Sequence, residues 1–177
     1  PHTYTLGTKG SRDHLLTPEE QLAREGIEVL DVDRGGNITY HGPGQLVGYP
    51  ILDLNPDRRD VHRYVRDLEE VLILAVRSFG VVAGRAPGLT GVWVGDAKVA
   101  AIGVRIARWV TSHGFALNVE TDLDHFRLIV PCGIADRGVT SLAQLLGAPP
   151  PMGQVEEAVV AAFAAVFDRS PQGHTHL

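Results

Sequence analysis

The chain has 177 residues, of which 44% are hydrophobic and 21% charged, a composition typical of a single soluble globular domain with a substantial core. Its net charge of −5 argues against general binding to nucleic acid or to a membrane surface. No apolar run approaches the roughly 20 residues that span a bilayer, and the single cysteine, Cys132, cannot form an internal disulfide. These features predict a cytoplasmic protein.

The first 32 residues predict a strand, a helix and a second strand. Residues 3–6 form the first strand, and a short helix follows Thr17, which can cap it, and ends at Gly26. Residues 27–32 then form a strand that leads into the most unusual part of the sequence.

That part is residues 34–50, RGGNITYHGPGQLVGYP, which hold five glycines. Ile38 and Tyr40 alternate with Asn37, Thr39 and His41, a period of two that predicts a strand with its polar side chains on one face. Glycines on both sides of such a strand are typical of a binding loop on a rigid support, and an ordinary surface hairpin is the alternative.

The remainder predicts a long helix over 58–79 and strands at 81–82, 89–94 and 98–106. Two more strands are expected at 109–111 and 115–119, around a His113-Gly114 turn. A short helix capped by Thr140 or Ser141 and a final helix over 154–167 complete the chain. Strands and helices do not alternate regularly, so the fold class is α+β (mixed α/β) with a partly antiparallel sheet.

One flank of the long helix carries Arg59, Arg63 and Arg66. A solvated helix face explains this pattern, and a docking patch for an acidic partner protein is the alternative.

Two residues are candidates for chemistry. Cys132 lies between Pro131 and Gly133, in a bend that would present the sulfur beside a bare amide, although a lone cysteine is commonly just a buried small residue. Lys98 opens a strand rich in alanine and glycine, where a lysine can be partly desolvated; a solvated turn lysine is the alternative.

Other common site types lack their patterns here. The eight histidines show no metal-ligand spacing, so we expect no metal and no cofactor. The glycine-rich stretch matches neither the phosphate-binding P-loop nor the dinucleotide fingerprint, and no GxSxG serine motif is present.

Four separated motifs together resemble the octanoyltransferase family: residues 34–50, KVAAIG at 98–103, HGFALN at 113–118 and PCGI at 131–134. The resemblance implies the fold of the biotin/lipoate protein ligases, with a central mixed, mostly antiparallel sheet flanked by helices. It also implies one catalytic domain over residues 1–177 that lacks the family's additional N-terminal strand and helix.

The resemblance further implies that an octanoyl group moves from acyl carrier protein, through a thioester on Cys132, to a lysine of a lipoyl-dependent enzyme domain, with Lys98 as the partner of Cys132. The acceptors would be lipoyl domains of 2-oxoacid dehydrogenases or the glycine cleavage H protein. The implied substrate pocket comprises Arg34, Gly35, Gly36, Asn37, Ile38, Thr39, Tyr40, His41, Ala101, Ile102, Gly103, Gly114, Phe115 and Ala116.

Two other functions fit the same fold. An ATP-dependent lipoate or biotin ligase would form an acyl-adenylate and would need no cysteine, whereas a non-catalytic module that binds carrier protein would need neither Cys132 nor Lys98.

Overall fold

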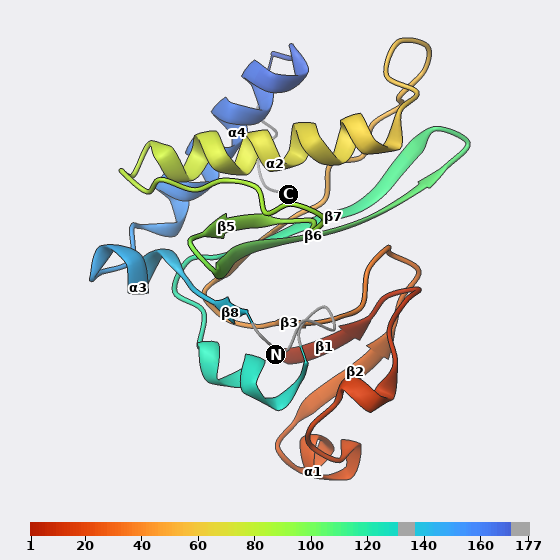
Figure 1. The fold of residues 1–177 in the computed structure, drawn as a ribbon, viewed down its shortest axis with the longest axis vertical. Coiled ribbons are helices and arrows are strands. Elements are labelled where there is room, and N and C mark those ends of the chain that lie inside the picture. Colours follow the sequence, from red (N-terminus) through yellow and green to blue (C-terminus); the bar gives the residue numbers. More distant parts are fainter. Residues whose placement is uncertain (131–136, 171–177) are drawn as a thin grey trace, which may run out of the picture.

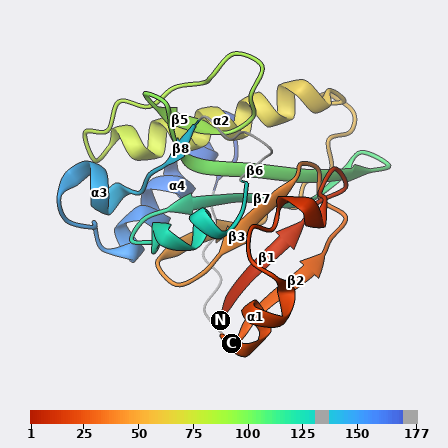
Figure 2. The ribbon, with the colours of Figure 1, turned by 60° about the horizontal axis from the view of Figure 1, so that its bottom comes forward.

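The computed structural model describes residues 1–130 and 137–170, which form two β-sheets and a layer of helices. Helices α2 (Val61–Arg77) and α4 (Met152–Phe167) cover one side of the larger sheet, and the smaller sheet lies on its other side (Figure 1). The same order of layers is visible when the molecule is turned (Figure 2). The smaller sheet therefore faces the large sheet on the side that the helices leave uncovered.

The larger sheet has five strands in the order β4-β7-β6-β5, with β8 beside β6. Its strands are β4 (Gln45–Gly48), β5 (Val92–Val94), β6 (Ala97–Ala107), β7 (Val110–Asn118) and β8 (Gly138–Val139). Among the described strands of this sheet, only the β6–β8 pair is parallel. The predicted mixed, mostly antiparallel arrangement is confirmed for these strands.

The smaller sheet has the order β2-β1-β3 and is formed by β1 (His2–Leu6), β2 (Ile27–Asp31) and β3 (Ile38–His41). Strand β1 is parallel to β2 and antiparallel to β3. The short helices α1 (Glu19–Arg24), η1 (Arg12–His14) and η2 (Leu123–Leu128) lie near this sheet, and α3 (Leu142–Leu146) follows β8. The resemblance implied one central sheet, whereas the described residues form two.

Each sheet has its own apolar cluster. Leu68, Leu72 and Val76 of α2 are fully buried between the helices and the large sheet. On the small sheet, Ile38 and Tyr40 of β3 are buried in the second cluster. At roughly 25 cal/mol per Å² of apolar surface, burial in these two clusters is the main stabilising contribution.

Helix α2 begins later than predicted because Asp60 caps it, accepting a hydrogen bond from the backbone N–H of Arg63 at 3.0 Å. The expected cap at Thr17 is wrong, since α1 starts at Glu19 after Pro18 and has no side-chain cap. Ser141, one of the two predicted caps for α3, accepts from the N–H of Gln144.

The largest error in the predicted elements concerns the β6–β7 hairpin. Residues 109–119 contain no turn at His113-Gly114; β7 is one strand, and Gly114 pairs with Gly103 across the hairpin. The chain reverses at Arg108 and Trp109, whose φ angles of 50° and 66° are those of a type I′ turn. Residues 81–82 form no strand, and within 89–94 only Val92–Val94 is extended in the sheet.

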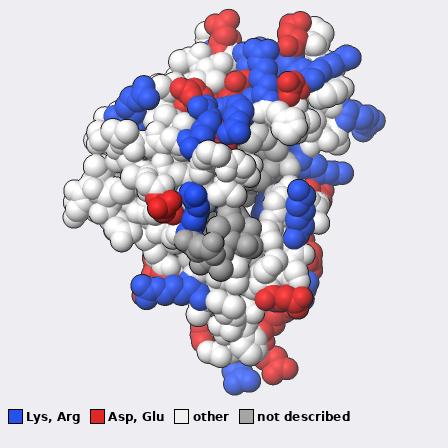
Figure 3. Space-filling model, in the orientation of Figure 1, with Lys and Arg blue, Asp and Glu red and all other residues white. Residues whose placement is uncertain are grey.

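On the face drawn in Figure 3, basic side chains in the upper part of the view are mixed with acidic ones. The contacts of the α2 flank agree with this mixture. Arg66 Nη1 lies 2.7 Å from a carboxylate oxygen of Glu69, and Arg59 Nε donates to Asn55 Oδ1 at 2.5 Å. Arg63 is exposed. This arrangement favours the solvated helix face over a concentrated basic patch.

Candidate active site

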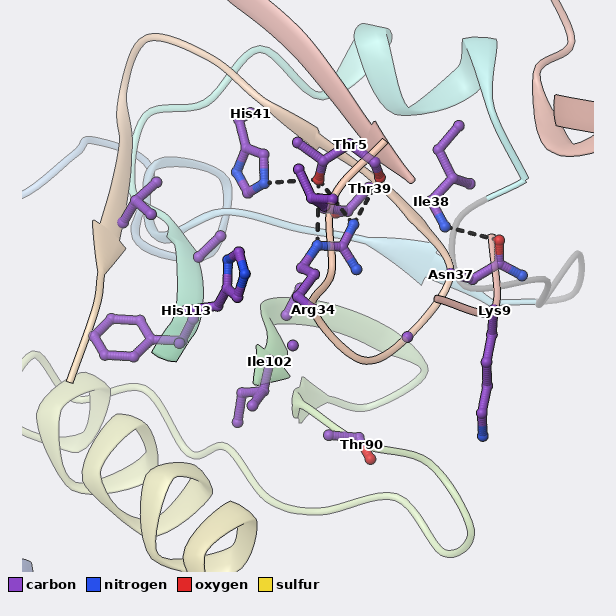
Figure 4. Close-up of a pocket in the computed structure, with 18 of the residues that line it drawn as sticks. Thr5, Lys9, Arg34, Asn37, Ile38, Thr39, His41, Thr90, Ile102 and His113 are labelled. Atoms are coloured by element: carbon purple, nitrogen blue, oxygen red, sulfur yellow. Dashed lines mark hydrogen bonds between the residues drawn. The ribbon is translucent and has the colours of Figure 1, made fainter. Parts of the chain in front are cut away.

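A cavity of about 780 Å³ lies between the two sheets (Figure 4). The small sheet and the glycine-rich stretch form one wall of the cavity, and β6 and β7 form the other. Twelve of the fourteen residues predicted as pocket lining do line it, namely Arg34, Gly36, Asn37, Ile38, Thr39, His41, Ala101, Ile102, Gly103, Gly114, Phe115 and Ala116, and so does Lys98. A cavity of this size is in the usual range for a small-molecule site.

Two predicted pocket residues lie elsewhere. Gly35 uses its N–H to donate to the carbonyl oxygen of Val104 at 2.8 Å, which ties the glycine-rich stretch to β6. Tyr40 is fully buried on the other face of β3, where its ring stacks on His125 at 4.8 Å between centroids. Burial raises the pKa of Tyr40 to about 12. Gly35 therefore joins this wall to β6, and Tyr40 packs behind the wall.

The sequence also missed several lining residues: Thr3, Thr5, Lys9, Leu30, Val32, Val47, Tyr49, Gly88, Leu89, Thr90 and His113. Strand alternation could have indicated Thr3 and Thr5, because Tyr4 and Leu6 between and after them are buried in the apolar cluster. No local signal marks Gly88, Leu89 and Thr90, which the fold brings to the cavity from the loop before β5.

Lys98 reaches the cavity because of a β-bulge. Val92 is paired with Ala100, but the next residue, Trp93, is paired with Lys98, so Val99 has no partner on β5. The extra residue changes the phase of alternation, and Lys98 lines the cavity together with Ala101, three positions later. Without the bulge these two side chains would point to opposite faces of the sheet.

Lys98 is only 7% exposed, as expected of a partly desolvated lysine. Its Nζ lies 4.8 Å from the centre of the Trp93 ring. Its carbonyl oxygen accepts from the N–H of Thr140 at 2.9 Å, and β8 pairs with it through Val139. The alternative of a solvated turn lysine is wrong.

Arg34 is the main cation of the opposite wall, and it is 9% exposed. Its Nη2 donates to the carbonyl oxygen of Thr5 at 2.6 Å and to Thr5 Oγ1 at 2.8 Å, while Nη1 donates to the carbonyl oxygen of Gly35 at 3.1 Å. These bonds orient the guanidinium beside the cavity (Figure 4). They also close the glycine-rich stretch against β1.

A chain of polar side chains continues from Thr5 along this wall. His41 Nε2 lies 3.2 Å from Thr5 Oγ1, and His41 Nδ1 lies 2.8 Å from Gln45 Oε1. The Gln45 amide donates to Asn118 Oδ1 at 2.9 Å, and Asn118 donates to the carbonyl oxygen of Thr140 at 3.1 Å. The chain thus ends beside β8, next to the backbone of Lys98.

The orientations in this chain determine the form of His41. Gln45 Nε2 faces two acceptors, Asn118 Oδ1 and the carbonyl oxygen of Tyr40, so Gln45 Oε1 must accept from His41 Nδ1–H. His41 Nε2 is then free to accept from Thr5. This neutral tautomer agrees with a pKa that burial, and secondarily the charge of Arg34, lowers below the usual value.

The predicted nucleophile Cys132 lies outside the described residues, as do the neighbouring residues 131 and 133–136. The residues on either side are anchored: the N–H of Val130 donates to the carbonyl oxygen of His14 at 2.8 Å, and the N–H of Gly138 donates to the carbonyl oxygen of Asp96 at 3.2 Å. The second anchor lies at the start of β6, close to Lys98 in the chain.

Among residues 1–130 and 137–170, no group of three or more His, Cys, Asp or Glu side chains could hold a metal ion. Within the same ranges, no helix has both the length and the apolar character that a membrane span requires.

The fold is shared with enzymes that attach lipoate or biotin to proteins. A bi-partite lipoate protein ligase from Thermoplasma acidophilum superposes with a TM-score of 0.81 over 99% of this chain and 71% of that one, at 19% identity. A lipoate-protein ligase A bound with ATP gives 0.79, with 18% identity and coverages of 94% and 69%. A biotin protein ligase from Aquifex aeolicus gives 0.62, with 16% identity and coverages of 93% and 70%. The predicted fold is confirmed.

Sequence comparison is more specific. The family model for the lipoyl protein ligase A/B catalytic domain matches residues 1–164. Octanoyltransferases from Myxococcus xanthus and Solibacter usitatus are each 54% identical over 95% of this chain, and one from Cytophaga hutchinsonii is 48% identical over 99%. The chain belongs to the octanoyltransferases of the lipoyl protein ligase A/B catalytic domain family.

This membership confirms the predicted family and favours a transferase over an ATP-dependent ligase. The chain spans about half the length of the Myxococcus relative, 49%, and about three quarters of the Solibacter and Cytophaga relatives, 76% and 75%.

Proposed function

We propose that residues 1–177 act as one catalytic domain that transfers an octanoyl group from acyl carrier protein to a lysine of a lipoyl domain, through a thioester on Cys132. The observation that carries the proposal is the buried Lys98 in the wall of a cavity that also contains most of the predicted pocket residues. The names of the relatives at about 50% identity support the same reaction. A cytoplasmic location, as the single cysteine suggests, is part of the proposal.

In the first step, the thiolate of Cys132 attacks the carbonyl carbon of the carrier thioester. The carbon–sulfur bond to the carrier breaks, and the carrier thiolate takes a proton from the Lys98 ammonium. One thioester replaces another, so the step is close to thermoneutral and requires no ATP. Lys98 is then a neutral amine.

In the second step, the ε-amine of the acceptor lysine attacks the acyl carbon of the Cys132 thioester. An amide bond forms, Cys132 leaves as a thiolate, and the neutral Lys98 accepts the proton that the attacking amine loses. The two steps return both side chains to their starting states, with acceptor lipoyl domains of 2-oxoacid dehydrogenases or glycine cleavage H protein as proposed partners.

The cavity walls supply binding energy for the acyl chain. Ala101, Ile102, Val47 and Phe115 line the cavity and give it an apolar surface. At about 0.8 kcal/mol per buried CH₂, full burial of an eight-carbon chain would contribute up to about 5–6 kcal/mol. Arg34 and the polar chain through His41 would orient the polar end of the donor.

The test is intact-protein mass spectrometry after incubation with octanoyl-acyl carrier protein. We expect the mass increase of one octanoyl group in the wild type and in the surface variant Arg24→Met, no adduct in Cys132→Ser, and an adduct formed at least about 100-fold more slowly in Lys98→Met. An undiminished adduct in Cys132→Ser would refute the proposal. Modification of a lipoyl domain by free octanoate and ATP, unaffected by Cys132→Ser, would instead establish a ligase.

A further inference from the structure

Trp93 lies directly under the side chain of Lys98. The two residues are opposite one another in the β5–β6 register, so their side chains leave the sheet on the same face. Trp93 is 4% exposed, and its ring centre is 4.8 Å from Lys98 Nζ. An ammonium over an indole face at this distance is attracted by the ring quadrupole, and the attraction increases when the pair is shielded from water.

The stem of Lys98 is also confined. A Cβ added to Gly91 would lie 3.3 Å from Lys98 Cε and 2.7 Å from the carbonyl oxygen of Ala100, so only glycine permits this close approach. Gly91 is held in turn by the fully buried Glu69, whose Oε1 accepts from the Gly91 N–H at 3.0 Å. Gly91 therefore restricts the methylene groups of Lys98, and the indole contacts its charged end.

The backbone of Trp93 is held by Gly84. Its N–H and carbonyl oxygen both bond to Gly84, at 2.9 and 2.8 Å. Among the described residues, its buried Nε1 has no hydrogen-bond partner. Replacement of the indole by another aromatic ring therefore removes none of the hydrogen bonds that the described part of the chain provides.

Within the described residues, the other charged groups around this contact have ion partners of their own. Arg137 Cζ lies 5.4 Å from the ring centre, and its Nη1 is 3.3 Å from a carboxylate oxygen of Asp96. Glu69 contacts Gly91 and is neutralised by Arg66 and Arg85 at 2.7 and 3.1 Å. Among the described residues, Lys98 and Arg137 both lie over the ring, and Arg137 is also held by Asp96.

We infer that Trp93 is a positioning residue for the reaction: its indole face holds the Lys98 ammonium at the cavity wall, ready to donate its proton to the departing carrier thiolate. This inference rests on the proposed role of Lys98. A lysine has four rotatable side-chain bonds, and a fixed attractive surface reduces the number of positions that Nζ samples before proton transfer.

The chain contains only two lysines, Lys9 and Lys98, so a direct structural test is available. In protein labelled with ¹³C-lysine, the Cε–Hε signals can be assigned with Lys9→Arg. We expect the Lys98 signal to be displaced upfield by the indole ring current, less so in Trp93→Phe, and to move to an ordinary lysine position in Trp93→Leu. The matched control is Trp109→Leu, which removes the only other tryptophan and should leave the Lys98 signal unchanged.

The kinetic test uses the same variants, after circular dichroism has shown that each is folded. Loss of the cation–π attraction in Trp93→Leu should lower kcat by roughly 3- to 30-fold with little change in KM, and Trp93→Phe should recover part of the loss. Trp93→Phe also covers the case in which Trp93→Leu does not fold. The inference would be overturned by a Lys98 Cε–Hε signal at the ordinary lysine position in the wild type, or by an equal kcat in wild type and Trp93→Leu. If the wild type forms no acyl adduct at all, the proposed function fails instead, and the Lys98 signal still tests the contact.

Discussion

The two walls of the cavity are built in different ways. The β6 wall presents small and apolar side chains, and Lys98 is its one charged lining residue within the described ranges. The opposite wall also includes Leu30, Val32 and Ile38. Its distinguishing feature is a connected series of polar groups, in which Arg34, Thr5, His41 and Gln45 bond to one another or to backbone. One wall has the character of an acyl binding surface with a single reactive group, and the other that of a hydrogen-bonded frame.

The two walls hold their side chains in position by different means. On the β6 wall, the position of a side chain depends on strand register, and one irregularity brings Lys98 into place. On the other wall, the position of each group depends on the hydrogen bonds of its neighbours, so the removal of one group affects several. Substitutions on the β6 wall should therefore change which substrate is used, whereas substitutions on the polar wall should change stability and pH response.

The largest effect is expected where the walls touch. A Cβ at Gly103 would lie 2.8 Å from the carbonyl oxygen of Gly35 and 2.9 Å from Arg34 Cδ, so Gly103→Ala must push the glycine-rich stretch away from β6. We expect a loss of about 2–3 kcal/mol in the free energy of unfolding, measured by urea titration. Ala101→Val is the matched variant, because Ala101 lines the cavity without that contact.

For Ala101→Val we expect near-wild-type stability and a preference for shorter acyl donors, measured as the ratio of adduct formation from hexanoyl and octanoyl carriers. The opposite result, with Gly103→Ala as stable as the wild type and Ala101→Val unable to fold, would contradict the division between the walls.

A somewhat smaller effect is expected for Arg34→Gln. The shorter, uncharged side chain cannot make all the bonds to Thr5 and Gly35, and their buried oxygens lose a charged donor. A loss of about 1.5–3 kcal/mol should appear in the same urea titration, accompanied by a higher KM for the donor. Arg24→Gln serves as the control, since Arg24 is exposed and lies 3.9 Å from its nearest carboxylate; an equal loss in both variants would contradict the importance of the Arg34 bonds.

The polar wall should also respond to pH through His41. Burial lowers the pKa of His41 in the folded protein, so the folded state binds this proton less readily than the unfolded chain. The stabilisation is complete above the unfolded pKa of about 6.5 and is lost as the pH falls from there through the lower folded pKa. Thermal unfolding between pH 5 and pH 8 should thus show a steeper acid-side decline for the wild type than for His41→Gln. His62 is exposed and serves as the control: His62→Gln should show the same acid-side decline in unfolding temperature as the wild type.

The smallest effect is expected at the rim, where Asp33 joins the two walls. One Asp33 oxygen lies 2.6 Å from His113 Nε2 and the other 2.6 Å from Arg105 Nη1. The hydrogen bond with His113, and secondarily the charge of Arg105, lowers the pKa of Asp33. Because the Asp33 and Arg105 side chains are 56% and 51% exposed, Asp33→Asn should not measurably change the unfolding temperature at about 0.15 M salt. A clear decrease would show a stronger link between the walls.

The sequence predicted the polar wall better than the β6 wall. The alternation of Ile38 and Tyr40 with Thr39 and His41 is local. The structure places Ile38 and Tyr40 in the apolar cluster and Thr39 and His41 at the cavity, which Ile38 also borders. The long helix was equally predictable, because its apolar residues repeat at helical spacing over many turns.

Non-local features could not be predicted in this way. A turn at Arg108 and Trp109 has none of the Asn-Gly or Asp-Gly signals of a type I′ hairpin, whereas His113-Gly114 looks like a turn and lies within a strand. Gly103 and Gly114 are glycines because other backbone segments approach them, and a linear pattern contains no information about those segments. The alanine- and glycine-rich strand correctly indicated a partly desolvated Lys98, but the bulge that orients its side chain depends on pairing with β5.

The bulge at Val99 makes the direction of Lys98 depend on the number of residues in the strand. If Val99 were deleted, Lys98 would lie two positions before Ala101, so ordinary alternation would keep both side chains on the cavity face. The chain would lose the buried Val99 side chain from its apolar core instead. A replacement of Val99 keeps the bulge in use, whereas its deletion makes the bulge unnecessary for the direction of Lys98.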